Sequence, residues 1–587
     1  MNSESAVFEK KLKLDVPKTA KVGLAFAIIC LFWSTYDFVV PLLLENAYGL
    51  SNTWRGLIMG LDNLLALFML PLFGKLSDSA KGKFANKYGR RTPFIVVGTI
   101  AAVLCMVFVP IAAKSQADNS NELRESYLME ISQNPAIMTE RLTSFYSDSR
   151  YCDIEYLETN NISKEQFINI RYNHLEKNGL FKNTYKYNGE PISKEAYSAL
   201  SKENGDYNKY VSSGMKVWIS EQVNEQVLST KTGTNSLIAY MIILFVCLLA
   251  MAIFRSPAVA LMPDVTPKPL RSPANAIINL AGGVGSVLAF IIYTITLMQN
   301  SPYNYVIIFA AVAGTMLLLL ALFLFLVKEK KLVKECREIC VEYGIDEASD
   351  DKVNDNKKIS YKDKSPEEKA KFKSFLLILA SIFMWFIGYN AVSSSMSIYC
   401  TKALNLPSSV ASIVSGVSMA VSAIAFIPVG FLATRIGRRK SIMFGFGLAV
   451  ISYILLLLFV KQSTNYLLPA VLFSTFYLIT GFGLIIANVN TFPMVVELSK
   501  AEDVGKYTGF YYTATMSAQA ITPMLSGLVM DNFGMRYLFA YSAVAVAIAI
   551  VIMFFVKHGD SKPIPKGTKL TPIEKKEIIL ESMGEAD

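Results

Sequence analysis

The stretch GLDNLLALFMLPLFGKLSD, residues 60–78, and the stretch GVSMAVSAIAFIPVGFLAT, residues 416–434, decide the fold. Each is an apolar run of about 20 residues, the length that crosses a bilayer as a helix. In both stretches a second glycine follows the first by fourteen positions, and both are followed by Gly-Arg-Arg, at 89–91 and at 437–439. This recurrence indicates that the chain contains two copies of one set of membrane-spanning helices.

The composition agrees with a membrane protein. The chain has 587 residues, of which 52% are hydrophobic and only 18% are charged, with a mean hydropathy of +0.37. A soluble protein of this length would carry more charge, and the apolar blocks lack the alternating pattern of an outer-membrane barrel. We therefore predict an all-α membrane protein with twelve transmembrane helices. The predicted spans are 22–44, 54–76, 94–113, 235–254, 275–297, 303–327, 373–399, 408–432, 441–460, 465–492, 509–530 and 535–556.

The twelve spans fall into two groups of six. We expect an N-terminal bundle over 22–327 and a C-terminal bundle over 373–556, related by pseudo-symmetry. A polar segment, 114–233, interrupts the first bundle between its third and fourth spans. We call it the insert, and its aromatic content favours a folded lid or docking module over a disordered loop. The other segments are an N-terminal segment 1–21, a lysine-rich central linker 328–372 and a tail 557–587.

Basic residues are distributed unevenly between the two sides. If the N-terminus is cytoplasmic, the inner segments carry most of the 57 Lys and Arg residues, and the short outer loops carry very few. This is the positive-inside pattern, so we predict a multi-pass protein of the plasma membrane with both termini cytoplasmic. The formal charge of +10 then reflects topology, and no nucleic-acid partner is expected. The outer bases are Arg55, Lys402, Lys461 and Arg536.

The sequence does not predict an enzyme. The two histidines, His174 and His558, lie in the insert and the tail, and the sequence has no G-x-x-x-x-G-K-[ST] loop for ATP. The glycines of AGGVGSVLAF, residues 281–290, are expected to let helices approach closely rather than to bind a nucleotide. We expect no cofactor and no metal site apart from that of a coupling ion.

The loop sequences resemble the major facilitator superfamily. GKLSD…GRR and GFLATRIGRRK resemble the superfamily motif of loops 2–3 and 8–9, with Asp78 four residues after Gly74 and Thr434 replacing this acid in the second copy. SD…GRRTPFI and PAVALMPD…RSPANAI are similar to the sucrose transporters and the glycoside–pentoside–hexuronide:cation symporters. The resemblance covers nearly all the spans but not the insert. It implies a substrate site between the halves and transport by alternating access, and we expect a monomer.

One acid interrupts the apolar run CLFWSTYDFVVPLLL, residues 30–44. By helix rise, Asp37 lies roughly 10 Å from the outer end of its span, and Asp62 in the next span lies roughly 12 Å from its own outer end. Two carboxylates at one depth on successive helices can bind a small cation through their oxygens or share a proton. We therefore predict a cation site at Asp37, Asp62 and Asn63. The alternative is that these residues pair structurally inside the bundle.

The repeat assigns this cation site to the first half. Asn390 and Ser418 stand where the first half has Asp37 and Asp62, so the second half keeps polarity without charge. The resemblance agrees, because melibiose permease-like members hold their coupling cation with carboxylates on helices one and two. Ala66 replaces the second helix-two acid of that pattern, so the coupling ion is left open as H⁺ or Na⁺.

Aromatic residues occupy matching turns of the first and seventh spans. Trp and Tyr offer a flat apolar ring for the C–H face of a sugar and one polar tip for a hydroxyl. The alternatives are an aromatic belt at the membrane surface or packing between helices. The predicted substrate-binding residues are Trp33, Tyr36, Trp385, Tyr389, Asn390, Ser394, Asn488 and Gln519.

Charged residues gather at the inner ends of the spans. The resemblance implies that they form ion pairs across the halves, which hold the outward-open state and break when the halves rock. Surface pairs contribute only about 0–1 kcal/mol each, which suits a latch that opens in every cycle; the alternative is that these charges only fix the topology. The predicted gating residues are Asp78, Arg90, Arg91, Arg255, Asp264, Arg271, Arg438, Arg439 and Glu497.

These observations predict secondary active transport. We expect cation-coupled symport of a sugar or glycoside across the lipid bilayer. With Arg255 assigned to an inner helix end, no basic residue is expected at mid-membrane, which favours neutral cargo over organic anions. One alternative is transport of another neutral polar solute, or drug efflux. A second alternative, from another class, is a transceptor or adhesion protein that acts through the insert.

Overall fold

The computed structural model describes most of the predicted membrane-spanning part of the chain. The described residues are 14–133, 135–147, 222–267, 270–299, 304–342, 366–404, 406–424, 437–461, 467–496, 498 and 504–559, together with 161, 163, 165–166, 186–187, 190–193, 195–196 and 219 of the insert.

The first half is built from six long helices. They are α1 (Val16–Asn46), α2 (Asn52–Asp78), α4 (Thr92–Gln133), α10 (Lys231–Asp264), α11 (Arg271–Leu297) and α12 (Asn304–Leu326). Two shorter helices are α3 (Lys83–Tyr88), between α2 and α4, and α13 (Glu329–Glu342), after α12. The insert contributes α5 (Pro135–Tyr146) and an antiparallel pair of short strands, β1 (Lys186–Tyr187) and β2 (Glu190–Pro191).

The second half is built in the same way. Its helices are α14 (Pro366–Ile398), α15 (Ser408–Ile424), α17 (Arg438–Phe459), α18 (Leu467–Val496), α19 (Val504–Phe533) and α20 (Tyr537–Phe554). A short π-helical turn, η4 (Tyr399–Ala403), continues α14.

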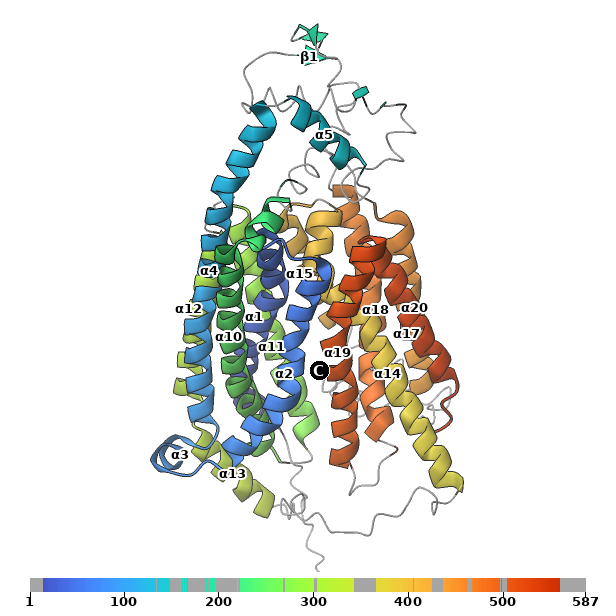
Figure 1. Ribbon diagram of the computed structural model, residues 1–587. Coiled ribbons are helices and arrows are strands. Elements are labelled where there is room, and N and C mark those ends of the chain that lie inside the picture. The colour runs from blue at the N-terminus through green and yellow to red at the C-terminus, as the bar shows by residue number, and fades with distance from the viewer. Residues whose placement is uncertain are drawn as a thin grey trace, which may run out of the picture.

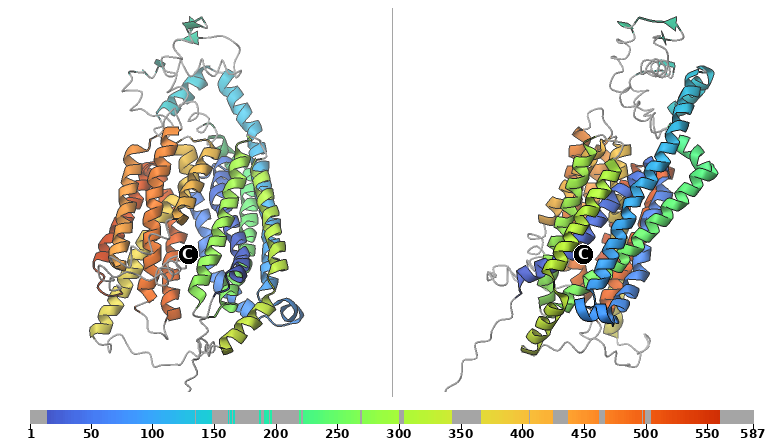
Figure 2. Two further views of the ribbon diagram at one scale, coloured as in Figure 1. Left: turned by 180° about the vertical axis from the view of Figure 1, so that it is seen from behind. Right: turned by 90° about the vertical axis from the view of Figure 1, so that its left-hand side faces the viewer.

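Each half forms one bundle, and the two bundles stand side by side (Figure 1). The insert projects from one end of the first bundle, which we call the insert face, and α3 and α13 lie at the opposite end, the linker face. Figure 2 shows the same arrangement from behind and from the side. Between the bundles, α2 packs along α19 and α11 along α15, while α1 contacts α14. The predicted all-α architecture of two bundles is confirmed.

Ten helices of the described chain are long and apolar enough to cross a membrane. The helices α15 and α19 coincide with predicted spans but are not among these ten. Only 17 residues of α15 are described, and α19 is rich in Thr, Ser, Gly and Tyr, which lowers its hydropathy. The structure is therefore compatible with the predicted twelve spans.

Two helices extend beyond the predicted spans. The sequence predicts an end at 113 for the third span, but α4 continues as one helix to Gln133. Polar residues with helix-compatible spacing extend it, including an i,i+4 ion pair of 2.7 Å between Lys114 and Asp118. Similarly, α10 ends at Asp264 and not at 254, because the apolar residues PAVALMP after Arg255 prolong the spanning helix.

The helices α1 and α11 pack closely through small residues. Gly285 of α11 lies against the backbone of Ala27, and Gly23 of α1 lies against the side chain of Ala281, so that neither glycine leaves room for a Cβ atom. The prediction that the glycines of residues 281–290 let helices approach closely is confirmed. This contact fixes α1 firmly within the first bundle, with one face turned toward the second.

Candidate functional site

One face of α1 remains accessible in the middle of the molecule. Between Ala25 and Glu45, all side chains are buried except four that lie three or four residues apart along the helix. We call these four the α1 stripe: Cys30, Trp33, Ser34 and Asp37. Because α1 is enclosed by α10, α11 and α12 of its own bundle and by α14 of the other, the α1 stripe points toward other helices and not toward lipid.

Asp37 is the most exposed side chain of the α1 stripe, and polar groups of four other helices surround it. Its carboxylate interacts electrostatically with Asp62 of α2 and Arg255 of α10, and with the hydroxyl groups of Tyr293 of α11 and Tyr389 of α14. By helix rise it lies about 14 Å from the insert end of α1, near the middle of a hydrocarbon layer about 30 Å thick. Its surroundings are those of an internal site shared by both bundles.

Asp62 lies at a matching depth on α2, about 15 Å from the insert end of that helix. Its side chain is half-buried, and the Asn63 Nδ2 donates a hydrogen bond of 2.8 Å to Asp62 Oδ1. The charge of Arg255 acts on this carboxylate as well. We call Asp37, Asp62 and Arg255 the interior charge cluster. The structure thus brings the three predicted cation-site residues together and adds an arginine to them.

Arg255 does not lie where the sequence places it. It was assigned to a gate at an inner helix end, but it lies nine residues, or about 14 Å, before the end of α10. Its guanidinium carbon is 5.7 Å from the centre of the Trp33 ring, within cation–π range. Among the described residues, no carboxylate forms a direct ion pair with Arg255. The expectation that the spans hold no mid-membrane base is therefore wrong.

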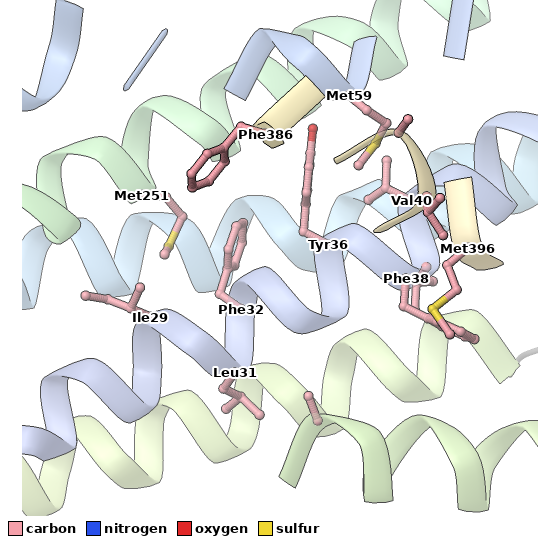
Figure 3. Close-up of a cluster of buried hydrophobic side chains, with 14 of the residues drawn as sticks. Ile29, Leu31, Phe32, Tyr36, Phe38, Val40, Met59, Met251, Phe386 and Met396 are labelled. Carbon is pink, nitrogen blue, oxygen red and sulfur yellow. The ribbon is translucent and has the colours of Figure 1, made fainter. Parts of the chain in front are cut away.

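Aromatic side chains of α1 flank the cluster. The rings of Trp33 and Tyr36 meet edge to face with centroids 5.4 Å apart, and Phe32 lies 5.3 Å from Trp33. The Trp33 Nε1 and the Tyr36 hydroxyl are buried and form no hydrogen bond within the described chain. Figure 3 shows Phe32 and Tyr36 beside Met251 of α10 and Phe386 of α14. The pair therefore keeps two unused donors at the contact between bundles.

The second bundle presents a matching accessible face on α14. Tyr389, Asn390, Ser393 and Ser394 are half-buried, whereas the residues just before and between these two pairs are buried. Asn390 Nδ2 donates a hydrogen bond of 2.8 Å to its own helix, at the carbonyl of Phe386, and Ser394 Oγ donates one of 2.6 Å to the carbonyl of Asn390. This face is polar and carries no charge.

Trp385 differs from its repeat counterpart Trp33. It has no exposed surface. Its ring stacks on Tyr389 with centroids 6.0 Å apart and packs against Phe446 of α17 at 4.9 Å. In this conformation the Trp385 ring offers no accessible surface to a substrate, because Tyr389 and Phe446 of α17 pack against it. At this position the packing alternative describes the structure.

The remaining predicted substrate residues lie on α18 and α19. Gln519 is half-buried on α19, next to Ala520, whose carbonyl lies against Gly60 of α2. Asn488 lies on α18, and its side chain is outside the described residues. Of these two, Gln519 is therefore the one that the structure places beside the first bundle.

The bundles are held together near the insert face. Asp531 of α19 accepts hydrogen bonds from the backbone N–H groups of Asn52 and Thr53 at 3.0 and 2.8 Å, and from their side chains at 2.7 and 2.6 Å. Asp531 thus caps the start of a helix that belongs to the other bundle. Further along α2, Gly56 and Gly60 touch the backbone of α19 where a Cβ atom would not fit. We call these contacts the insert-face latch.

A buried ion cluster adds to the insert-face latch. Glu45 at the end of α1 pairs with Arg55 of α2 and with Lys402 of η4, which belongs to the second half. Sequence reasoning named Arg55 and Lys402 only as outer-loop bases, and it missed Glu45 and Asp531. One signal could have indicated this cluster. The outer loops carry few bases, and a base that becomes buried there requires an acidic partner such as Glu45.

At the linker face, the predicted gating residues pair within the first bundle. Arg91 Nε donates a hydrogen bond of 2.9 Å to Asp264 Oδ2, and its Nη2 pairs with Asp78. Arg90 Nη1 donates to the carbonyl of Asp78 at 3.3 Å. The expected ion pairs across the halves are therefore not formed by these residues in this conformation. Figure 1 shows the bundles diverging toward this face, which explains why the first-half charges turn to one another.

The other four predicted gating positions lie elsewhere. Arg439 Nη2 donates a hydrogen bond of 2.6 Å to the carbonyl of Phe554 within the second bundle, and Arg438 precedes it at the start of α17. The side chains of Arg271 and Glu497 lie outside the described residues.

Glu329 is a functional candidate that sequence reasoning missed. Its carboxylate accepts hydrogen bonds from the backbone N–H and the hydroxyl of Thr92, both at 2.7 Å, and from the N–H of Arg91 at 3.0 Å. Glu329 thereby caps α4 from the start of α13 and ties the linker side of α12 to the Arg91 cluster. No local sequence signal marks a cap that is supplied from more than two hundred positions away.

Comparisons with known proteins agree with this architecture. The model of the Major Facilitator Superfamily matches residues 377–582. Solute carrier family 45 member 3 from Mus musculus and from Homo sapiens is 34% identical over 73 residues, which cover 12% of this chain and 12% of the relative. The Multi-drug resistance efflux pump PmrA homolog of Lactococcus lactis subsp. lactis is 32% identical over 90 residues, or 15% of this chain and 22% of that protein. These matches span a small part of each relative.

Solved structures share the fold across most of the chain. A bacterial homologue of the iron transporter ferroportin, in an inward-facing state, has a TM-score of 0.52 at 13% identity and covers 92% of this chain and 99% of its own. A POT family transporter in complex with 5-aminolevulinic acid has a TM-score of 0.50 at 12% identity and covers 91% of this chain and 95% of its own. At such identities the likeness concerns the fold alone.

The two bundles of spanning helices define a multi-pass membrane protein with polar groups between its halves. The match to the Major Facilitator Superfamily covers residues 377–582, about a third of the chain and most of its second half.

Proposed function

We propose that this protein is a secondary active transporter that couples the symport of a sugar or glycoside to a proton or sodium ion by alternating access. One observation carries the proposal. Asp37 and Asp62, on two different helices at mid-membrane depth, act on one another electrostatically beside aromatic residues of both bundles. Two acids placed in this way suit a small cation or a shared proton.

The cation binds before the cargo in the proposed cycle. A pair of unneutralised carboxylates resists the loss of water that occurs when a site closes, so cation binding permits closure. The bundles then rock until the insert-face latch forms, and cargo and cation leave at the linker face. The closed insert face and the diverging linker ends (Figure 1) fit the release step of this cycle.

The choice of a neutral cargo no longer rests on the absence of a mid-membrane base, because Arg255 is one. It rests on neutral polar groups and aromatic rings. Trp33 supplies a half-buried ring, and Tyr36, which is buried in this conformation, supplies a hydroxyl without a hydrogen bond in the described chain. From the opposite side α14 supplies Tyr389, Asn390 and Ser394. A sugar presents C–H faces to such rings and hydroxyls to such donors and acceptors. The residues proposed to hold the cargo therefore come from both halves, as alternating access requires.

The function is tested in proteoliposomes with radiolabelled sugars and glycosides, with the sodium gradient and the pH gradient varied separately. We expect one of the two gradients to drive uptake against a concentration difference. Asp37→Asn and Asp62→Asn should each abolish this accumulation while counterflow exchange continues, because the site no longer needs the cation. Asp118→Asn, which removes an exposed acid on α4, is the matched control. Intact accumulation in both site variants would overturn the proposal.

Two other functions give different results in related assays. The name of the Lactococcus lactis relative suggests drug efflux. In that case everted vesicles would accumulate the cargo in exchange for the cation, instead of taking up cargo and cation together. A transceptor or adhesion protein would need its insert and not its helices. Deleting residues 115–232 and measuring uptake separates this case, since transport by the helices survives the deletion.

The proposed cellular setting follows the distribution of basic residues. We place the protein in the plasma membrane as a monomer, with both termini and the linker face in the cytoplasm and the insert outside. Accessibility of single cysteines to an impermeant reagent at Lys81, near the linker face, and at Asp118, near the insert face, tests this orientation. Labelling of Lys81→Cys in intact cells would contradict it.

A further inference from the structure

The interior charge cluster contains an odd number of charges. Asp37 and Asp62 contribute two negative charges and Arg255 one positive charge, so the cluster carries −1 when all three are ionised. Arginine stays ionised in proteins, unlike lysine or histidine. The positive charge in this cluster is therefore permanent, and only the two acids can change the net charge.

The surrounding helices supply no further charge at this depth in the described chain. On α1, α2 and α10, the other charged side chains lie near the ends of the helices, at the insert-face latch or the linker face. The groups that face Asp37 from α11 and α14 are the hydroxyls of Tyr293 and Tyr389, and Tyr36 lies beside it on α1. Phenols are neutral near pH 7.

Arg255 acts electrostatically on both acids and forms a direct ion pair with neither. Its guanidinium lies over the Trp33 ring, acts on Asp37 and on Asp62, and forms no direct ion pair with a described carboxylate. A guanidinium in this position lowers the negative charge of the whole site without occupying the oxygens that a coupling cation needs. Half-burial in the interior strengthens this effect, because screening by water is reduced.

We propose that Arg255 is the built-in counter-ion of the interior charge cluster and sets the coupling ratio at one monovalent cation per cargo molecule. The inference rests on the proposed function, cation-coupled transport of a neutral cargo. One bound cation brings the cluster from −1 to zero, and a site of zero charge is the one that closes with least loss of hydration energy. Two acids without Arg255 would require two cations.

This charge arithmetic predicts an unusual pattern among variants. Asp62→Asn leaves Asp37 and Arg255, which already sum to zero, so cargo moves without a cation and accumulation is lost. Arg255→Gln leaves a cluster of −2, which one cation does not neutralise. The double variant Asp62→Asn with Arg255→Gln returns the cluster to −1, as does Asp37→Asn with Arg255→Gln. A second substitution is thus expected to restore what the first abolished.

The experiment measures cation flux and cargo flux together in proteoliposomes that hold the wild type, the two single variants Asp62→Asn and Arg255→Gln, and both double variants. We expect a ratio of one for the wild type and accumulation within about threefold of the wild type in at least one double variant, where Asp62→Asn alone gives none. Lys81→Gln, which removes an exposed base near the linker face, controls for loss of positive charge. Arg255→Lys keeps the charge. It should therefore keep the ratio of cation flux to cargo flux at one, even if transport is slower.

The results that overturn the inference differ from those that overturn the function. A wild-type ratio of two, or double variants that accumulate no more than Asp62→Asn does, would refute the role of Arg255 while leaving coupled transport intact. If Arg255 instead binds an anionic group of the cargo, Arg255→Gln and both double variants lose counterflow as well, which also refutes the inference. Transport independent of any cation in the wild type would refute both proposals. The wild-type ratio decides the matter even where a variant fails to fold.

Discussion

The two faces of this protein use their charged residues in opposite ways. At the insert face, polar contacts cross between the bundles: Asp531 of α19 caps α2, and Glu45 of α1 pairs with Lys402 of η4. At the linker face, Arg91 pairs with Asp78 and Asp264 of its own bundle. The sequence motifs predict contacts between the bundles at the linker face, but in this conformation the polar contacts described between the bundles lie at the insert face.

In the proposed transport cycle, this difference indicates which contacts must break in each half. The insert-face latch joins the bundles, so it must open before the insert side can admit cargo. The Arg91 cluster joins helices of one bundle only, so separation of the bundles leaves it unchanged. Glu329 makes that cluster more rigid by capping α4, which keeps the linker ends of the first bundle together while they move as one body.

The strongest test of this comparison removes the close approach of α2 and α19. Gly60→Val places a branched side chain where the carbonyl of Ala520 lies, and overpacking of this kind costs about 1–3 kcal/mol. We expect uptake to fall about tenfold or more, because the insert face no longer closes. Spin labels at Trp54 and Phe533, in a cysteine-free background, should move apart.

The matched control for Gly60→Val is Gly314→Ala on α12, where an added Cβ atom meets nothing within 4 Å. It should leave uptake and the label distance unchanged. If the distance between the two labels in Gly60→Val equals that in the wild type, the contact of α2 with α19 does not limit closure of the insert face.

A smaller effect is expected from the cap. Asp531→Ala removes the acceptor of four hydrogen bonds at the start of α2, and loss of a helix cap costs about 1 kcal/mol. The closed population of the insert face should fall about fivefold relative to the open one. Asp531→Asn keeps an acceptor oxygen and should lose less. The same spin-label distances measure both variants, and equal losses would argue against a capping role.

The smallest effect is expected from an exposed pair at the linker face. Lys18 Nζ donates a hydrogen bond of 2.9 Å to Glu335 Oε2 of α13, and this bond, with the charge of Lys18, lowers the pKa of the Glu335 carboxyl. A lowered pKa in the folded state stabilises the fold above the ordinary glutamate pKa, and this stabilisation is lost as pH falls through the folded-state pKa. Because Glu335 is 38% exposed, solvent screening limits the pair to a few tenths of a kcal/mol, or less than about 1 °C in Tm.

This pair is tested by thermal unfolding in detergent at pH 7 and at pH 3.5 or below (about one unit under the ordinary glutamate pKa). Glu335→Gln should lower Tm slightly at neutral pH and have no effect at acid pH. Glu338→Gln, on the same helix and 64% exposed, is the control. A Glu335→Gln effect that persists in acid would exclude the ion pair as its cause.

Features that depend on local sequence were predictable. Hydropathy located the helices, because the length of an apolar run is read directly from the chain, and the repeat of residues 60–78 at 416–434 gave the two bundles. The meeting of Asp37 and Asp62 was also predictable, since helix rise along two successive antiparallel spans places both acids at one depth.

Features that depend on long-range contact were not predictable. Apolar residues lie on both sides of Arg255, so hydropathy alone does not fix the end of α10. The predicted span ended too early, and Arg255 was therefore assigned to the membrane surface instead of the interior. The cap of α2 by Asp531 joins residues 479 positions apart, and no motif marks it. The repeat predicted equal roles for Trp33 and Trp385, but ring packing against Phe446 is a property of the second bundle alone.

The helix α4 connects the insert to the first bundle, which carries Asp37 and Asp62. With 42 residues in one helix, it is about 63 Å long, roughly twice the hydrocarbon thickness. Its outer part extends beyond the bundle, so a small tilt of the first bundle produces a larger displacement at the end of α4 near α5. A fluorescent label on α5 would record each turnover as displacement. If tilt of the first bundle and displacement of the tip are coupled, a protein bound at the tip would in turn change the equilibrium between the conformations of that bundle.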